Sequence, residues 1–143
     1  MKITKEFLQE RLKNNHFINH LGMNLDEIDD GSAEMSLTVE QHHLQQNGFL
    51  HGGVTASILD VVTGIAAYTQ VSDTSKNVVT ADLKVSYLNP CVSKKIVAKG
   101  RVRKGGRFLL FCEGELYDTL EDGNLKLVAT CSSIMVAVDI PVV

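Results

Sequence analysis

One stretch of this sequence says most about the fold: Gly48-Phe49-Leu50-His51-Gly52-Gly53-Val54-Thr55-Ala56-Ser57-Ile58-Leu59-Asp60. Apolar residues follow the paired glycines at helical spacing, which predicts a helix from about Gly53 to Gln70. Glycines at a helix entrance let a ligand approach backbone N–H groups that lack a partner inside the helix, and these groups favour negative charge. The helix entrance is therefore a candidate oxyanion site, with the Gly52 amide as its donor.

Asp60 lies on this helix away from the bulky side chains. At about 100° per residue, an apolar stripe falls within roughly 80° of Val54, whereas Asp60 lies roughly 120° away. Small residues surround Asp60 on a face that holds no Lys, Arg or Glu: Ala56, Ser57, Gly64 and Ala67. An acid in such a setting is costly unless it has a role, so we interpret Asp60 as a catalytic carboxylate. The alternative is an exposed acid on a solvated face.

Gly52 and Asp60 are too far apart to serve one site within one chain. A helix rises about 1.5 Å per residue, so they lie roughly 12 Å apart along the helix. A base must come within hydrogen-bond reach of the group it serves, directly or through one water. A second, antiparallel copy of the helix across a two-fold axis can bring them together. The spacing therefore predicts a composite site at a homodimer interface.

Length and composition limit the class of protein. The 143 residues are enough for one domain with its own core, so residues 1–143 are treated as a single domain. The net charge of −3 argues against broad nucleic-acid binding, which favours a basic face. Neither a signal peptide nor a membrane span is expected. An odd number of widely spaced cysteines favours reduced core thiols in a cytoplasmic protein: Cys91, Cys112 and Cys131.

The other segments predict an antiparallel sheet packed on the helix. Residues 3–20 predict a covering helix, or two short ones broken near Asn14-Asn15, and residues 23–29 and 33–40 predict a hairpin. Four strands follow the central helix, and the first of them, 77–87, is expected to turn its odd-numbered residues to the core. The next two strands, on either side of Gly105-Gly106, are expected to form a hairpin. Their apolar side chains lie on one face only if the numbers of paired residues add up to an even value, as for Lys99 with Glu113. That register predicts a bulged or three-residue loop at 105–107.

This order and its motifs resemble the hotdog-fold acyl-CoA thioesterases of the phenylacetate-degradation type, in the 4-hydroxybenzoyl-CoA thioesterase superfamily. The matching motifs are Leu21-Gly22-Met23, Gly48-x-x-His51-Gly52-Gly53 with Asp60, and Thr80-Ala81-Asp82-Leu83-x-Val85-x-Tyr87-Leu88-x-Pro90. The resemblance implies an α+β hotdog fold, in which an antiparallel sheet wraps around one long helix. It also implies cytoplasmic hydrolysis of an acyl-CoA to free acid and coenzyme A, without metal or cofactor, by a homodimer that assembles as a homotetramer.

The resemblance also implies roles for particular residues. The Gly52 amide polarises the thioester carbonyl, and Asp60 of the facing subunit acts as general base or nucleophile. Thr80 helps to hold the water, and Gln45 stands where many members carry Asn, so it orients the carbonyl or the water. Two further motif residues are expected to contact the substrate: Gly53 and Ala81.

Several residues keep two interpretations. His51 either meets the thioester or fixes the turn into the helix. A metal site built from His51 and its neighbours His42 and His43 is not expected, because adjacent histidines in an extended segment point to opposite sides. Three basic residues near the 105–107 turn have no assigned acid partner and are candidates for the phosphates of coenzyme A, the alternative being ordinary solvation: Arg103, Lys104 and Arg107.

Two other functions fit the same fold. A non-catalytic acyl-CoA sensor would be expected to carry a DNA-binding segment, and none is visible in the first twenty or so residues. A hydratase or dehydratase relies on a His–acid pair that is placed differently. Aryl, medium-chain and isoprenoid-precursor acyl groups are all compatible with the sequence.

Overall fold

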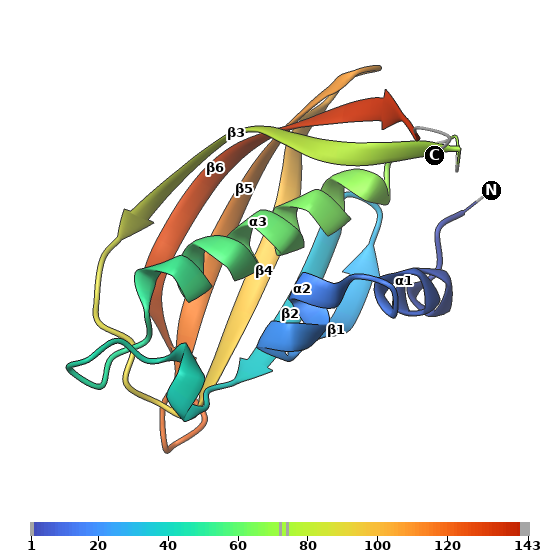
Figure 1. The fold of residues 1–143 in the computed structure, drawn as a ribbon. Coiled ribbons are helices and arrows are strands. Elements are labelled where there is room, and N and C mark those ends of the chain that lie inside the picture. The colour runs from blue at the N-terminus through green and yellow to red at the C-terminus, as the bar shows by residue number, and fades with distance from the viewer. Residues whose placement is uncertain (1, 72, 74, 141–143) are drawn as a thin grey trace.

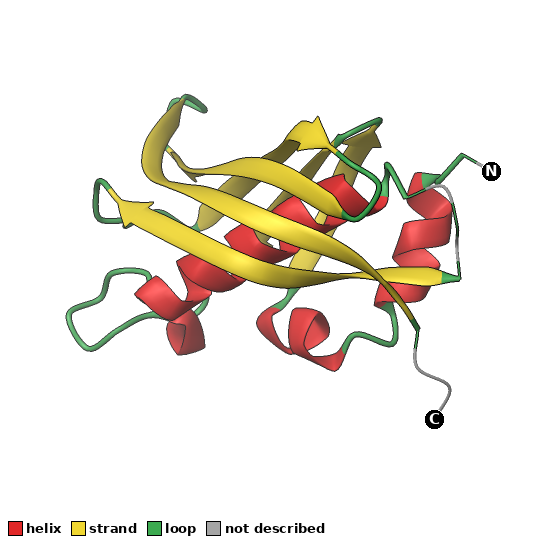
Figure 2. Cartoon of the chain, turned by 90° about the horizontal axis from the view of Figure 1, so that it is seen from above, coloured by secondary structure: helices red, strands yellow, loops and turns green. Residues whose placement is uncertain are grey.

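A single six-stranded antiparallel sheet curves around one long helix, α3 (Gly52–Tyr68) (Figure 1). The strands lie side by side in the order β1 (Met23–Asp29), β2 (Ser32–Thr38), β4 (Lys95–Gly105), β5 (Leu109–Thr119), β6 (Leu125–Asp139) and β3 (Lys76–Tyr87). The structure is a computed structural model, and it describes residues 2–71, 73 and 75–140. Figure 2 shows the curved sheet around α3, with the short helices on the side of α3 that the sheet leaves open. The expected hotdog architecture, an antiparallel sheet wrapped on a central helix, is confirmed.

The elements follow the predicted order of two strands, one long helix and four strands. Two short helices precede them, and Asn15 separates these because its side chain caps the second one, accepting from the Ile18 amide at 3.1 Å. None of the helices in the described ranges is long and apolar enough to cross a membrane. The elements are α1 (Lys5–Leu12), α2 (His16–Leu21), β1 (Met23–Asp29), β2 (Ser32–Thr38), the 3-10 turn η1 (Gln41–His43), α3 (Gly52–Tyr68), β3 (Lys76–Tyr87), β4 (Lys95–Gly105), β5 (Leu109–Thr119) and β6 (Leu125–Asp139).

The core lies between α3 and the concave face of the sheet. Ile58, Leu59 and Val62 of α3 are fully buried there, together with sheet residues such as Met35 and Leu116. The helix comes very close to β4 at Gly100, where an added Cβ would lie only 2.7 Å from the carbonyl oxygen of Val62. A glycine at this point therefore allows the sheet to close on the helix and sets the position of α3.

Strand β3 departs from the predicted alternation at a β-bulge. Its register to β6 shifts between Thr80 and Asp82, which leaves Ala81 as the extra residue. Before the bulge, Val78 packs against the core while Val79 is 45% exposed. The prediction that every odd position from 79 onward faces the core was therefore wrong, because one extra residue reverses the side-chain alternation. The consequence is that Thr80 turns toward α3.

The β4–β5 hairpin also contains a bulge, in a different place from the one predicted. Lys99 lies opposite Glu115 and Arg101 opposite Glu113, so the even sum is correct but the predicted Lys99–Glu113 pair is wrong. The register shifts at Arg103, within β4, and not in the loop at 105–107. The hairpin does contain the extra residue that the prediction required, but this residue lies within strand β4 and not in the turn.

Asp118 of β5 holds the loop that follows β3. Its buried carboxylate accepts hydrogen bonds from the Val92 amide at 3.0 Å, the Ser93 amide at 3.2 Å, the Ser93 hydroxyl and the Cys91 thiol. Burial alone would raise the pKa of Asp118, but the hydrogen bonds from Ser93, Val92 and Cys91 outweigh it and keep the pKa below its usual value.

All three cysteines are free and buried, and burial is the main cause that raises the pKa of Cys91 to about 12.

Asp118→Asn is expected to lower the free energy of unfolding near neutral pH by about 1–3 kcal/mol, because an amide would point its own donors at these N–H groups. The folded-state pKa lies below the unfolded value of about 3.9, so the stabilisation is present above that pH and is lost as the pH falls through the folded pKa. The thermal unfolding temperatures of the parent and of Asp118→Asn should therefore approach each other as the pH is lowered. A difference in unfolding temperature that stays constant at every pH would contradict this account. Asp30→Asn, at an exposed residue, serves as the control.

Candidate active site

His51 shapes the entrance to α3. Its Nδ1 accepts a hydrogen bond from the Gly53 amide at 2.8 Å, and its carbonyl oxygen accepts one from the Val54 amide at 3.0 Å. His51 itself is in an extended conformation just before the helix. These are the contacts expected of a histidine that fixes the turn into the helix, and they occupy the Gly53 amide.

Gly52 begins α3, and its amide has no hydrogen-bond partner among the residues that the structure describes. Its carbonyl oxygen accepts a hydrogen bond of 2.7 Å from the Tyr87 hydroxyl. The Tyr87 ring lies against it, since a Cβ on Gly52 would be 3.3 Å from a ring carbon. Both ends of the Gly52–Gly53 peptide are thus held, by Tyr87 and by His51, and the adjacent Gly52 amide is a donor in a fixed position.

Tyr87 is the part of this arrangement that the sequence did not reveal. It was predicted on the core face of its strand, but it is 57% exposed and holds Gly52, 35 residues away in the chain. The motif that contains Tyr87 was a signal that the residue matters. Its partner depends on how the end of β3 meets the start of α3.

Asp60 is half-buried in the middle of α3 and is joined to Thr80. The Thr80 hydroxyl donates a hydrogen bond of 2.6 Å to Oδ1 of Asp60 and lies 3.4 Å from the sulfur of Met135. The bulge at Ala81 makes this contact possible, because an unbroken alternation would have turned Thr80 to the outer face. The structure therefore brings together two of the predicted site residues, from a helix and from a strand.

Asp60 and Gly52 line different clefts of the chain. One cleft, of about 480 Å³, lies between α1, α2, α3 and β3 and contains Asp60 and Thr80. The other, of about 370 Å³, lies at the α3 entrance and contains Gly52, Gln45 and Tyr87. One chain thus carries two separate groups of predicted site residues.

The remaining predicted residues are dispersed. The Gln45 Oε1 accepts from the Asn47 amide in its own loop. Ala81 is exposed at the bulge, and Lys104 is exposed on β4. The Arg107 guanidinium lies 5.2 Å from the centre of the Phe108 ring.

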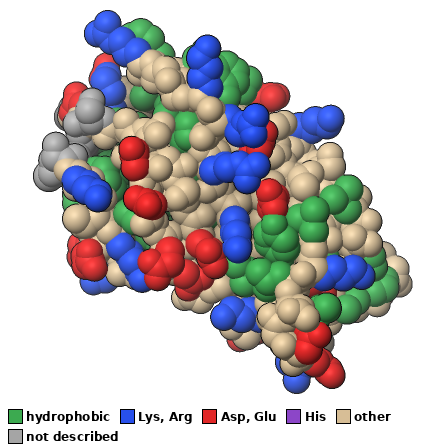
Figure 3. All heavy atoms as spheres, turned by 180° about the vertical axis from the view of Figure 1, so that it is seen from behind, with side chains coloured by type: hydrophobic (Ala, Val, Ile, Leu, Met, Phe, Trp, Pro, Cys, Tyr) green, Lys and Arg blue, Asp and Glu red, His purple; other side chains and the backbone are tan. Residues whose placement is uncertain are grey.

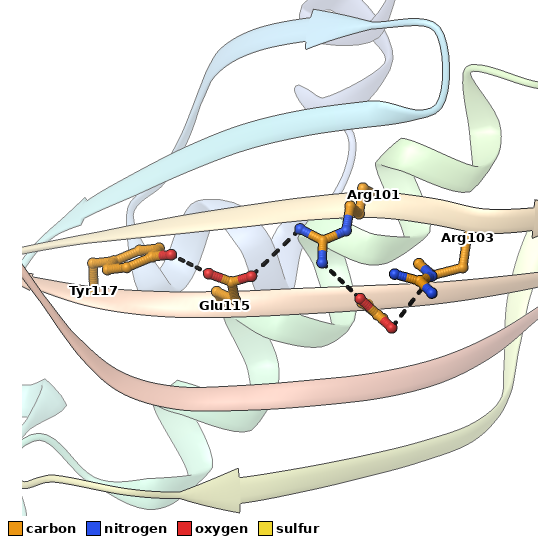
Figure 4. Close-up of polar contacts among 5 residues, drawn as sticks. Arg101, Arg103, Glu115 and Tyr117 are labelled. Atoms are coloured by element: carbon orange, nitrogen blue, oxygen red, sulfur yellow. Dashed lines mark hydrogen bonds and ion pairs between the residues drawn. The ribbon is translucent and has the colours of Figure 1, made fainter.

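Arg103 has an acid partner, contrary to expectation. Its Nε lies 3.5 Å from Glu113, which also pairs with Arg101 at 2.7 Å, so one carboxylate serves two arginines (Figure 4). Figure 3 shows the outer face of the sheet, where Lys and Arg side chains are mixed with acidic ones. The mixing reduces the net positive potential of this surface.

The reason given against a histidine metal site was also wrong. His42 and His43 lie in the 3-10 turn η1, not in an extended segment, and their rings are 4.0 Å apart. His43 is instead engaged by the backbone, since its Nδ1 accepts from the Glu40 amide at 2.9 Å and its Nε2 lies 2.7 Å from the Leu21 carbonyl oxygen.

Residues 47–122 match the family model described as the thioesterase superfamily. The chain belongs to this superfamily. The matched segment runs from before the helix entrance to just beyond the end of β5, so it contains Gly52, Asp60 and Thr80. Gln45 and the N-terminal helices lie outside it. As a member of the thioesterase superfamily, the protein is a thioester hydrolase.

Relatives and solved structures agree with this membership. A putative esterase of Saccharolobus solfataricus is 29% identical over 85% of this chain and 77% of its own. Acyl-coenzyme A thioesterase 13 of Mus musculus is 28% identical over 56% of each chain. The crystal structure of a thioesterase family protein from Silicibacter pomeroyi superposes with a TM-score of 0.87 at 26% identity, covering 92% of this chain and 96% of that one.

Proposed function

We propose that this thioesterase hydrolyses acyl-CoA substrates at a composite site, formed by Gly52 of one subunit and Asp60 of the facing subunit. The observation that carries the proposal is the separation of the two groups: a fixed, free amide in one cleft and an acid–hydroxyl pair in another. The similarity to acyl-coenzyme A thioesterase 13 of Mus musculus supports acyl-CoA as the substrate class.

The chemistry needs only these groups and water. The thioester oxygen accepts a hydrogen bond from the Gly52 amide, which stabilises the negative charge that develops when the carbonyl carbon is attacked. Asp60 either takes a proton from the attacking water or attacks the carbonyl itself. Collapse of the intermediate releases the thiol of coenzyme A and, directly or after hydrolysis of an acyl-enzyme, the free acid. One oxyanion donor typically raises the reaction rate by about 10²–10³-fold, and a general base raises it by about 10²–10⁴-fold.

The other predicted residues support this centre. Gln45 lines the Gly52 cleft and orients the carbonyl or the water from there. Gly53 gives its amide to His51, and a Cβ on it would lie 3.0 Å from the His51 Nδ1, so its contribution is the lack of a side chain. Lys104 and Arg107 contact the phosphates of coenzyme A, with Arg103 available because an exposed ion pair is weak.

Two surfaces support the assembly. β3 is an edge strand of the sheet, and the α3 face around Asp60 carries small, half-buried residues, so a second copy can approach both elements closely. On the outer face, exposed apolar side chains gather on neighbouring strands, where Val79 and Leu109 both pair with Val136 and Phe111 is 42% exposed. We assign the first surface to the dimer and the second to the association of dimers into a homotetramer.

The test of the proposed function is release of free thiol from a panel of acyl-CoA substrates. The purified protein should liberate coenzyme A and the free acid in equal amounts. A non-catalytic acyl-CoA-binding protein would bind the same compounds without releasing thiol, and that result would contradict the proposal. Light scattering of the same sample measures the assembly.

Thr80→Ala is expected to lower kcat by about tenfold, because the hydroxyl assists Asp60 and the water without replacing either. Thr80→Ser keeps a hydroxyl at Cβ and should retain most of the activity. Steady-state kinetics of both variants provide the measurement. Equal activity in Thr80→Ala and the parent would remove the hydroxyl from the site.

A further inference from the structure

The cleft that contains Asp60 extends along α3 beyond the catalytic acid. Tyr68 lines the same cleft, about 12 Å farther along the helix axis than Asp60. Apolar side chains and three asparagines, Asn14, Asn15 and Asn77, line the cleft together; the apolar ones are Leu8, Leu12, Ile18, Val61, Ile65, Val78 and Met135. A mixed lining of this kind, which begins at the reacting group and leads away from it, fits an acyl tail that carries a polar group.

A positive charge lies at the far end of this cleft. The Arg11 guanidinium, in the last turn of α1, lies 5.0 Å from the centre of the Tyr68 ring. The contact with the Tyr68 ring and the negative end of the α1 dipole both favour a cation at this position. Within the described part of the chain, however, Arg11 forms no ion pair with a carboxylate. Its charge therefore remains available to an anion.

The Tyr68 side chain adds a second, independent signal. Only 5% of Tyr68 is exposed, and its hydroxyl is buried without a hydrogen-bond partner among the described residues. Thr63 on the same helix shows the usual alternative, since its buried hydroxyl donates to the Leu59 carbonyl at 2.9 Å. A buried hydroxyl without a partner is unfavourable, and phenylalanine would fill the same space without that cost. A ligand oxygen that entered beside Arg11 would supply the missing partner.

We infer that the cleft takes an acyl group with an oxygen at its far end, and that Arg11 and Tyr68 favour a carboxylate there. The inference rests on the proposed function, because it takes Asp60 as the reacting end. Of the described residues that line the cleft, Asp60 is the only acid and Arg11 the only base. A distal carboxylate held by Arg11 lies much closer to that cation than to Asp60, which is roughly 12 Å away along the helix, so the attraction outweighs the repulsion. The substrate class is thus an ω-carboxyacyl thioester.

The experiment compares three series of acyl-CoA compounds with matched chain lengths, from hexanoyl to decanoyl: unsubstituted, ω-hydroxy and ω-carboxy. Thiol release gives kcat/KM for each. At the length that spans the cleft, the ω-carboxy compound should exceed the unsubstituted one by roughly tenfold to one-hundredfold, as expected for hydrogen bonds to a charged group. The difference should reside mainly in KM, because the contact is remote from the reacting bond.

Three variants assign the preference to its residues. Arg11→Met should abolish the preference for the carboxylate, and Arg11→Lys should restore only part of it, because lysine lacks the planar fork of donors. Tyr68→Phe should lower the preference for both oxygenated series, and its thermal stability should equal or exceed that of the parent, since the variant loses an unpartnered buried hydroxyl. Lys13→Met is the matched control: Lys13 follows α1, pairs with Glu10 and does not line the cleft.

Two results would overturn the inference while leaving the proposed function intact. One is faster hydrolysis of the unsubstituted compound at every chain length. The other is an unchanged ratio of ω-carboxy to unsubstituted activity in Arg11→Met. Failure of the parent to release thiol from any compound would instead contradict the proposed function, and the inference with it.

Discussion

Asp60→Asn is expected to lower kcat/KM for acyl-CoA hydrolysis by about 10²-fold or more, as for the loss of a general base or nucleophile. The substitution keeps the size of the side chain, and its amide oxygen can still accept the hydrogen bond that the Thr80 hydroxyl now donates at 2.6 Å. Fold and assembly should therefore persist. The loss should appear in the chemical step and not in substrate binding.

The measurement is steady-state kinetics beside circular dichroism and light scattering. Asp30→Asn makes the same chemical change on an exposed turn and should show parental kinetics. Near-parental turnover in Asp60→Asn would exclude the carboxylate from the mechanism. A variant that loses both activity and assembly would show that Asp60 supports the interface, and activity measured per intact oligomer would then decide its chemical role.

Gly52→Pro is expected to cost about 10²–10³-fold in kcat, because proline removes the N–H group that is proposed to stabilise the oxyanion. The position tolerates proline in other respects. Gly52 is the first residue of α3, where proline is favoured, and His51 before it has φ −63° and ψ 134°, which suit a residue that precedes proline. The helix should therefore form normally.

Gly52→Ala is the matched control, because it retains the amide. Its Cβ would lie 3.3 Å from the Tyr87 ring, as would that of proline, so alanine reproduces the steric change at Cβ while it keeps the N–H group. We expect alanine to cost much less than proline. Equal losses would show that contact with Tyr87, and not the hydrogen-bond donor, limits the activity.

Mixing Gly52→Pro with Asp60→Asn tests the composite site directly. In a hybrid dimer, one site has both defects and the other has neither, so activity up to half of the parental rate should return. Mass spectrometry verifies that subunits have exchanged. No recovery in verified hybrids would mean that Gly52 and Asp60 do not act together across an interface.

The central helix and its acid could be predicted from local patterns. The paired glycines mark where α3 begins, and the spacing of the apolar residues that follow sets which face is buried. The same patterns placed Asp60 on the face of small residues and roughly 12 Å from Gly52. Each of these properties depends on residues within a few helical turns, so the sequence alone was sufficient for them.

The contacts that complete the site depended on the tertiary structure. Thr80 reaches Asp60 because β3 bulges at Ala81, and a bulge is defined by pairing with another strand, here β6. Tyr87 meets Gly52 from 35 residues away. The apolar–polar alternation along β3 does not reveal that one of its residues has no partner on β6. The predicted core face of β3 was wrong for this reason. The sequence by itself determined the central helix, the succession of helices and strands along the chain and the position of the acid on its helix. Packing between distant segments decided which side chains hold that acid and the amide donor in place.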